Sequence, residues 1–496
     1  METTGSKRTT LTAEEVEFAG ENVDSALVFL NNASDVTFTE DEDRSLVRKV
    51  DWMLLPLLAA VYMLQFVDKN LINFANIMGL GVDTGTSSKQ FTTLAWSYWV
   101  TYLLSQPLAG YVLQKLPVAK VLGWNVTLWG VVVALNCVCK NYASLLALRI
   151  VLGIFESCVS PSMIIITAMW YKRQEQPLRF GIWGGTIGIG IFADSLCSYG
   201  LLHYHGKTFR SWQIMFLVFG LLTIVIGLLV VFFLPDNPMT CKRLTEKERV
   251  IAIARLQGDT TGIENRTFKT AQVWELLVDS RAWMMFTMNT AINIPNAAVS
   301  TFQAAIITSL GFSPTQAALL SLPSGAVGII GIAAASYSAY RFQTRSASIL
   351  GLLVFGFFGT ALLTFLPDHD EAGRLVGVYL TNLIPTSAPI VYSWVAANFA
   401  GHTKKTMMNA LIMMSFCLGN ALGPLSFTTP PAYWAAKVTM LATLGFAILV
   451  LGMLVFSYRL ENNKRARHLR SSGDHDDGLI SFMDLTDRKN KKFVEL

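Results

Sequence analysis

Charged residues are scarce in this chain. They make up 15% of its 496 residues, whereas a soluble domain of ordinary composition carries about 25%. Hydrophobic residues reach 52%, and the mean hydropathy is +0.44. This deficit of charge indicates a chain whose solvent is lipid rather than water.

Several other sequence features are absent, and each absence excludes a class of function. The six cysteines have no spacing typical of a zinc site or a disulfide framework, so we interpret them as small buried hydrophobes. Despite a net charge of +5 there is no concentrated basic stripe, and nucleic acid is not an expected partner. The N-terminus lacks the basic start and apolar core of a signal peptide. Without a His-rich box, a Ser-His-Asp set or a metal-ligand cluster, we expect no enzyme, cofactor or metal.

Twelve apolar stretches are long enough to cross a membrane as helices, since a spanning helix needs about 20 apolar residues. They occupy residues 52–75, 91–114, 118–139, 143–170, 178–204, 211–234, 282–310, 315–340, 346–366, 373–399, 405–428 and 433–458. Lysine and arginine gather on alternate loops and on both tails. By the positive-inside rule, both termini are expected to be cytoplasmic.

The longest polar loop divides the spans six and six. We therefore expect a disordered N-terminal tail, a first bundle, a cytoplasmic central loop, a second bundle and a cytoplasmic C-terminal tail, at residues 1–49, 50–234, 235–281, 282–459 and 460–496. Within the loop, "LTEKERVIAIARLQ" (244–257) predicts an amphipathic surface helix. Thr245 is its expected N-cap, with Glu248 three residues later.

Ionisable residues at membrane depth are concentrated in the first half. Asp68 and Lys69 fall in the first span, Arg149 and Glu156 in the fourth, and Asp194 in the fifth. Each costs about 2.5–3.5 kcal/mol even on lenient insertion scales, so we expect them to face a cavity or a partner. The spans of the second half carry amides instead, at Asn289, Asn293, Asn296, Gln303, Asn382, Asn409 and Asn420.

The stretch "LLALRIVLGIFESCVSP" (145–161) places Arg149 and Glu156 on one helix face, two turns apart. At a rise of about 1.5 Å per residue, their Cα atoms lie about 10 Å apart. Arginine keeps its charge and offers a fork for a carboxylate, while a glutamate at membrane depth can take up a proton near neutral pH. Together they predict binding of an organic anion coupled to a proton. The alternative is an internal salt bridge that ties this helix to its neighbours.

Asp68 and Lys69 form a second pair. The ammonium of Lys69 is a candidate anion-binding group, and the alternative is a side chain that snorkels to the membrane surface. Asp68 and Asp194 are candidate proton sites, with a hydrogen-bonded structural role as the alternative for Asp194. Among the amides, Asn293 and Asn420 are candidates for contact with the body of the substrate.

The glycines of "FGIWGGTIGIGIF" (180–192) superficially suggest a phosphate loop. A preceding strand and a following Lys-Ser/Thr pair are absent, so the motif is incomplete. Glycines inside an apolar span predict close packing against a neighbouring helix instead.

Several stretches occur in a familiar order: "LQFVDKNLINFAN" (64–76), "QPLAGYVLQKLPVAKVLG" (106–123), "ALRIVLGIFESCVSP" (147–161), "MWYKRQEQPLRFGIW" (169–183), "FLPDNPMTCKRLTEKER" (233–249), "AANFAGHTKK" (396–405) and "CLGNALGP" (417–424). Together they resemble the major facilitator superfamily, and within it the fungal allantoate permease branch of the anion:cation symporter family. Two departures stand out. Lys69 is found where that branch usually has arginine, and Gln114 where many members have aspartate.

The resemblance implies an all-α integral membrane fold of twelve helices in two pseudo-symmetric six-helix bundles, with alternating access around a midplane site. It also implies proton-coupled import of a small organic anion such as allantoate, ureidosuccinate, nicotinate or pantothenate. Lys69, Arg149 and Glu156 match the positions that serve binding and coupling in related carriers. The alternatives are export of an acidic secondary metabolite and a non-transporting nutrient sensor.

The expected partners are therefore the small organic anion, a proton and the lipid bilayer. The expected setting is a monomer in the plasma membrane, with the vacuolar membrane as the alternative.

Overall fold

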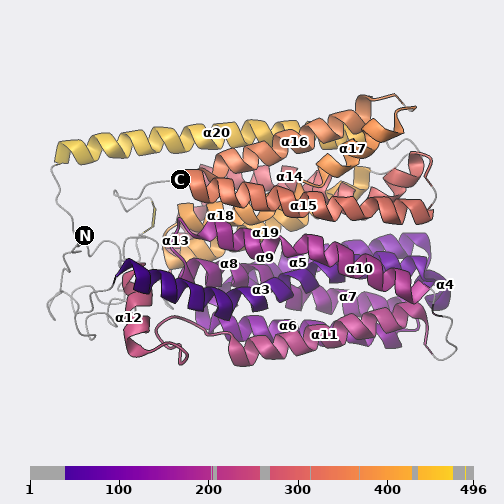
Figure 1. The fold of residues 1–496 in the computed structure, drawn as a ribbon, viewed down its shortest axis with the longest axis horizontal. Coiled ribbons are helices and arrows are strands. Elements are labelled where there is room, and N and C mark those ends of the chain that lie inside the picture. Colours follow the sequence, from indigo (N-terminus) through magenta and orange to yellow (C-terminus); the bar gives the residue numbers. More distant parts are fainter. Residues whose placement is uncertain are drawn as a thin grey trace.

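The computed structural model describes residues 39–202, 204, 209–256, 268–312, 314–367, 369–426, 434–472 and 486–487. Within these residues every regular element is a helix. The helices of the first half lie together, and those of the second half lie beside them, so the chain forms two bundles (Figure 1). Helices α12 and α13 lie at one end of the bundles and α4 at the other (Figure 1). We call these the α13 end and the α4 end.

The first bundle contains α3 (Glu40–Ile77), α4 (Leu80–Thr84), α5 (Ser88–Lys115), α6 (Val118–Leu135), η2 (Asn136–Val138), α7 (Tyr142–Glu156), α8 (Val159–Trp170), α9 (Gln176–Gly184), α10 (Thr186–Leu202) and α11 (Ser211–Phe233). The central loop contains α12 (Glu246–Ala254) and α13 (Thr270–Leu277). The second bundle contains α14 (Ser280–Ser309), α15 (Pro314–Phe342), α16 (Arg345–Phe365), α17 (Glu371–Thr381), η3 (Pro385–Ser387), α18 (Ala388–Asn398), α19 (His402–Leu422), η4 (Gly423–Ser426) and α20 (Trp434–Ser472).

Nine helical segments of the described part are long and apolar enough to cross a membrane. They coincide with nine of the twelve predicted spans. The other three predicted spans fall on α5, α14 and α19, which have 28, 30 and 21 residues but are not among the nine. All three contribute to a cavity between the bundles, where polar side chains face protein rather than lipid.

The first and last helices extend beyond the predicted bundles. Helix α3 begins at Glu40, ahead of the boundary expected at residue 50. Its start is stabilised by Thr39 and Glu42, whose backbone N–H groups each donate to the other's side chain, at 3.0 and 3.3 Å. Helix α20 continues to Ser472, past the boundary expected at residue 459. Residues 1–38 lie outside the described part, so disorder there stays a prediction.

The predicted amphipathic helix of the central loop is confirmed as α12. Thr245 caps it, and Glu248 completes the capping box, as the sequence predicts. The apolar side chains of residues 250–253 are buried. Helix α12 therefore packs against the first bundle, where it contacts α3.

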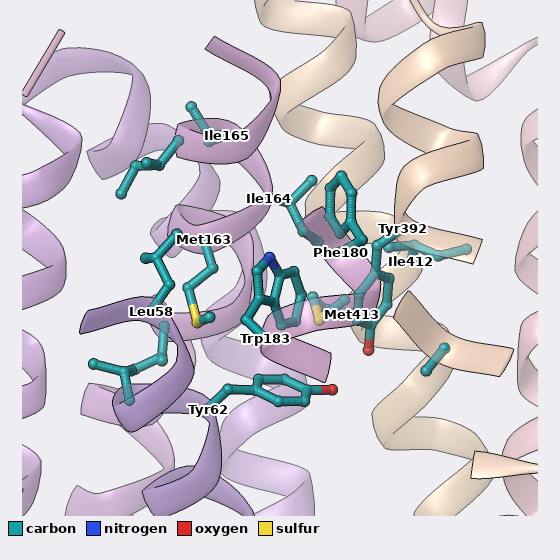
Figure 2. Packing of buried hydrophobic residues seen from close by; sticks show 14 of the residues in the cluster. Leu58, Tyr62, Met163, Ile164, Ile165, Phe180, Trp183, Tyr392, Ile412 and Met413 are labelled. Atoms are coloured by element: carbon teal, nitrogen blue, oxygen red, sulfur yellow. The ribbon is translucent and has the colours of Figure 1, made fainter. Parts of the chain in front are cut away.

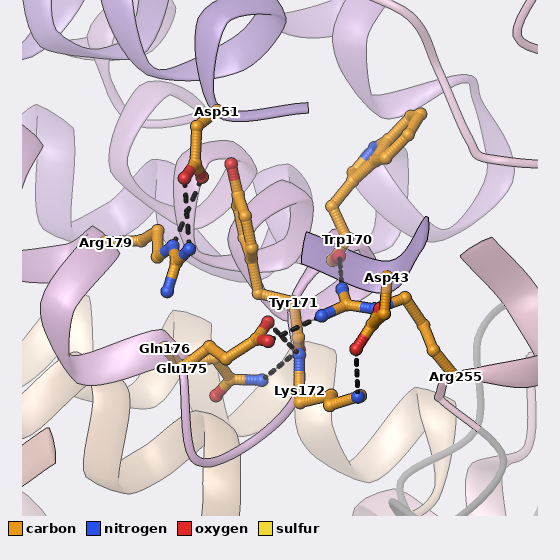
Figure 3. Close-up of polar contacts among 9 residues, drawn as sticks. All are labelled: Asp43, Asp51, Trp170, Tyr171, Lys172, Glu175, Gln176, Arg179 and Arg255. Atoms are coloured by element: carbon orange, nitrogen blue, oxygen red, sulfur yellow. Dashed lines mark hydrogen bonds and ion pairs between the residues drawn. The ribbon is translucent and has the colours of Figure 1, made fainter. Parts of the chain in front are cut away.

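A buried arginine fixes α12 to the first bundle (Figure 3). The side chain of Arg255 is 2% exposed and lies 2.5 Å from both Asp43 Oδ1 and Glu175 Oε1. Lys172 Nζ donates to Asp43 Oδ2 at 2.8 Å. One network therefore joins the start of α3, the turn between α8 and α9, and the end of α12.

Glycines allow close packing inside the first bundle, because the hydrophobic effect supplies little attraction between helices in lipid. A Cβ at Gly130 of α6 would lie 2.7 Å from the backbone nitrogen of Ile224, and one at Gly220 of α11 would lie 2.5 Å from that of Ala134. Helices α6 and α11 thus pack backbone against backbone along their length.

Four of the five glycines at 180–192 pack against the second bundle and Gly190 packs against α3, which confirms the prediction of close helix packing. A Cβ at Gly184 would lie 2.4 Å from Pro389 Cγ, and one at Gly188 would lie 2.7 Å from Gly325 O. Beside them, Trp183 is buried among side chains of both bundles, including Tyr62 and Tyr392 (Figure 2). The apolar core is therefore continuous across the boundary between the bundles.

Replacing Arg255 with alanine is expected to destabilise the protein by about 1.5–3 kcal/mol, because the loss of this buried guanidinium breaks its charged hydrogen bonds to Asp43 and Glu175. The thermal unfolding midpoint of the purified protein in detergent measures this effect. The matched control is Arg44→Ala, since the Arg44 side chain is 69% exposed and its surface ion pairs are worth less than about 1 kcal/mol. Equal shifts for the two variants would contradict the structural role of Arg255.

Candidate functional site

A cavity of about 130 Å³ lies between the two bundles. Its wall includes side chains from α3, α5, α7 and α10 of the first bundle and from α14, η3, α18 and α19 of the second. Residues named as candidates from the sequence that line it are Asp68, Lys69, Arg149, Asn296 and Asn420. A charged cavity shared by two bundles is the usual place for a substrate site in such folds.

Lys69 is enclosed by a carboxylate and two aromatic rings. Its Nζ lies 3.4 Å from Glu156 Oε1 and 5.7 and 5.5 Å from the ring centroids of Trp99 and Phe416. The side chain is 21% exposed, so it remains in the cavity wall. Phe416 belongs to α19, so Lys69 links the two bundles at the cavity. The snorkelling alternative does not describe this position.

Arg149 is the second cation of the cavity wall. The residue is 5% exposed. No hydrogen bond or ion pair to its guanidinium is found within the part of the chain that the structure describes. Its neighbour two turns along the helix, Glu156, pairs with Lys69 instead. A desolvated guanidinium without a carboxylate partner is suited to a bidentate anion.

Of the two carboxyl groups near the cations, Asp68 lines the cavity and Glu156 does not. Glu156 is fully buried, and neither of its oxygens accepts a hydrogen bond from a described residue. Asp68 is 3% exposed, and its Oδ2 accepts a hydrogen bond from Trp129 Nε1 at 3.1 Å. Both carboxyl groups therefore have oxygens without a hydrogen-bond donor. An unpaired charge in a site without water is costly, and binding of a proton removes that cost.

Asp194 does not line the cavity. It lies in α10, is 1% exposed, and neither oxygen has a hydrogen-bond partner among the described residues. It interacts electrostatically with Asp68. The structure therefore relates it to the site through Asp68 rather than through direct contact with the cavity.

The two predicted amides differ in position. Asn420 lines the cavity, and its Nδ2 donates to the carbonyl of Phe416 at 2.8 Å. Asn293 does not line it; its Nδ2 donates to the carbonyl of Asn289 at 2.8 Å, and its Oδ1 accepts from Asn296 Nδ2 at 3.0 Å. Asn296 is the α14 amide that reaches the cavity.

The fourth predicted span is broken next to Glu156. Helix α7 ends at Glu156 and α8 begins at Val159, with Pro161 in its first turn. Proline has no N–H, so it cannot donate to the carbonyl four residues earlier, which belongs to Ser157. Gln106 Nε2 from α5 donates to that carbonyl instead, at 3.0 Å. Irregular backbone at membrane depth is tolerated when a neighbouring helix satisfies it in this way.

Polar contacts join the bundles at the α13 end. Gln114 Nε2 donates to Thr403 Oγ1 at 2.8 Å. The guanidinium of Arg173 donates to the carbonyl of Ala397, and that of Arg345 donates to the carbonyl of Arg173. These contacts hold the bundles together on one side of the cavity.

Sequence reasoning missed Trp129 and Gln106 as parts of the site. Both are fully buried and act on the charged helices from neighbouring elements. For Gln106 a signal existed, because Pro161 leaves a carbonyl without its helical donor. For Trp129 none existed, since its pairing with Asp68 depends on how α6 packs against α3.

Two bundles of apolar helices around a buried, charged cavity define a membrane-embedded transporter rather than an enzyme. The model of the Major Facilitator Superfamily matches residues 58–424, and the chain belongs to this family.

Its relatives are transporters as well. The chain is 33% identical to the thiamine pathway transporter THI73 of Saccharomyces cerevisiae, over 90% of this chain and 85% of that protein. It is 29% identical to the allantoate permease of the same yeast, over 96% of this chain and 91% of that protein. Among solved structures it resembles FucP, a major facilitator superfamily transporter in the outward conformation. That match has a TM-score of 0.61 and 12% identity, over 81% of this chain and 98% of that one.

Replacing Trp129 with phenylalanine is expected to destabilise the protein by about 1–3 kcal/mol, because the buried Asp68 carboxylate loses its hydrogen bond. The matched control is Trp124→Phe on the same helix, since Trp124 is 53% exposed. Thermal unfolding of the purified variants measures both. A Trp129 variant no less stable than the control would show that this hydrogen bond contributes little.

Proposed function

We propose that this protein is a proton-coupled importer of small organic anions that works by alternating access. The observation that carries the proposal is the guanidinium of Arg149, which lines the cavity between the bundles without a carboxylate partner among the described residues. The relation to an allantoate permease supports an anionic substrate.

The anion binds between the two cations of the cavity. Arg149 receives the carboxylate, and Lys69 adds a second positive charge from α3. Asn420 and Asn296 offer amides to the body of the substrate, together with the rings of Trp99 and Phe416. Because these groups come from both bundles, a bound anion draws the bundles together.

The proton binds at Glu156, with Asp68 and Asp194 as further acceptors. A substrate carboxylate that approaches Lys69 competes with Glu156 for the ammonium. Once Glu156 loses its cation, its charge is uncompensated in a dry environment, and protonation removes that cost. Anion and proton then move together, and the loaded site gains no net charge.

The α13 end is the cytoplasmic side in this proposal, because α3 begins and α20 ends there (Figure 1), and the positive-inside rule assigns their basic flanks to the cytoplasm. The contacts at that end then correspond to closure toward the cytoplasm. The protein is proposed to act as a monomer in the plasma membrane.

The experiment that tests the function is uptake of a panel of labelled small acids by cells that lack their own anion permeases. We expect uptake to be faster at acidic than at alkaline external pH and to collapse with a protonophore. Arg149→Ala is expected to reach the membrane but to reduce uptake by about 30-fold or more, since loss of a charged partner costs about 2–5 kcal/mol. The control is Arg210→Ala, whose side chain is 68% exposed.

Normal uptake by the Arg149 variant would remove the core of the proposal. If no acid enters through protein shown to be at the cell surface, the same panel tests the exporter alternative in efflux assays.

Glu156→Gln is expected to separate exchange from accumulation. The amide keeps the shape of the side chain but cannot cycle a proton, so substrate should still exchange across the membrane in both directions. Proton-driven accumulation should be lost. Counterflow and net uptake in proteoliposomes with an imposed pH gradient measure the two separately. Normal accumulation by this variant would exclude Glu156 as the coupling group.

A further inference from the structure

A short segment near the end of the chain is buried against the second bundle. Thr486 and Asp487 are each 1% exposed, although they follow a polar stretch well beyond α20. Thr486 Oγ1 donates to Glu275 Oε2 at 2.9 Å. A Cβ at Gly401 would lie 3.1 Å from Thr486 Cγ2, so the segment packs on the turn that precedes α19. The last residues of a domain are usually poorly ordered unless contacts with the rest of the protein hold them, so this burial indicates a docked position.

The site is a cluster of charged side chains from three helices at the α13 end. Lys404 Nζ of α19 lies 2.8 Å from Asp487 Oδ1, 3.0 Å from Glu275 Oε1 and 3.2 Å from Asp279 Oδ2. Arg281 of α14 lies 3.6 Å from Asp487 Oδ2. The Lys404 side chain is fully buried, so its charge must be balanced by these carboxylates.

Asp487 is the third carboxylate beside two cations. Burial and the charge of Asp279 raise its pKa above the ordinary value, although Lys404 and Arg281 oppose that shift. Among the described residues, the cluster therefore remains balanced without Asp487, since Glu275 and Asp279 match Lys404 and Arg281 in charge. Docking of the tail adds contacts but is not needed to neutralise the charge of the cluster. The segment can therefore leave, and Lys404 still has carboxylate partners in Glu275 and Asp279.

The cluster adjoins a contact that holds the bundles together. Thr403, directly before Lys404, accepts the hydrogen bond from Gln114 of the first bundle. The backbone N–H of Lys404 donates to Gln272 Oε1 of α13 at 3.1 Å. The tail contacts both α13 and α19, so it packs against the start of α19 beside that contact.

We infer that Thr486 and Asp487 form a removable clamp, which docks between α13, α14 and α19 and stabilises closure of the bundles at the α13 end. The clamp acts through the start of α19, because the described contacts of Thr486 and Asp487 are with α13, α14 and α19. Release of the tail loosens Thr403 and weakens its contact with Gln114. The chain thus carries its own ligand for a site that controls access at that end.

Spin-label distances in the full-length protein test the docking. One label is placed at Trp274→Cys on α13, a position that is 69% exposed, and the other at Lys489→Cys, in a background with the native cysteines replaced by alanine. We expect a short, narrow distance distribution that becomes broad with Asp487→Asn. The matched control is Asp476→Asn, which removes the same charge from the same tail. A second variant, Thr486→Val, is expected to broaden the distribution as well.

Thiol labelling at Ala397→Cys tests the effect on closure. Ala397 is fully buried and lies where Arg173 joins the bundles, so a soluble maleimide reacts there only when that end opens. We expect Asp487→Asn to increase the labelling rate several-fold and Asp476→Asn to leave it unchanged.

A distance distribution that Asp487→Asn does not alter would overturn the docking. A released tail with an unchanged labelling rate would overturn the clamp. Neither readout requires transport, so failure of the clamp and failure of the proposed transport function are distinguishable.

Discussion

The buried ion pair of Lys69 and Glu156 is the interaction on which the arrangement of the cavity depends. At an effective dielectric of about 20, two unit charges at the observed 3.4 Å attract each other by about 5 kcal/mol. Removal of each ion from water costs several kcal/mol, so the net gain is close to zero. Because the attraction and the desolvation cost nearly cancel, the pair can position α3 against α7 and still be broken by a competing carboxylate. Trp99 and Phe416 keep the ammonium in place when the pair opens, through cation–π contacts.

The charges around the cavity also constrain what can cross. Two cations, Lys69 and Arg149, lie near the carboxylates of Asp68 and Glu156, and Asp194 interacts with Asp68 from behind the cavity. A bound monoanion adds one negative charge to a set that already has an excess of acid. A proton bound at the same time restores the original balance, which makes joint movement cheaper than movement of the anion alone. In the proposed function, coupling then follows from electrostatics and needs no separate gate for the proton.

Much of the fold is readable from the sequence because membrane helices must satisfy their own backbone and be about 20 residues long. The capping box of α12 and the glycine packing at Gly184 follow from local patterns. The charges at Asp68, Lys69, Arg149 and Glu156 stand out because they are expensive in lipid. Their pairing could not be predicted. The helical spacing favoured a contact between Arg149 and Glu156, but α3 packs against this helix so that Lys69 pairs with Glu156. Likewise, Asn293 is engaged by its own helix, and Asn296 takes the cavity position, because helix rotation is set by packing.

The central loop explains how two rigid bundles can move without coming apart. Arg255 ties α12 to the first bundle through buried ion pairs, whereas α13 is tied to the second through Glu275, Gln272 and Lys404. Strong interactions therefore lie within each half. At the α13 end, the described hydrogen bonds between the two bundles join Gln114 to Thr403 and the guanidinium groups of Arg173 and Arg345 to backbone carbonyls. Each is worth about 0.5–3 kcal/mol, so they can break and re-form while the bundles keep their shape. Because α12 is attached to the first bundle and α13 to the second, the central loop does not lock the two bundles to each other. We therefore expect motion at the boundary between the bundles.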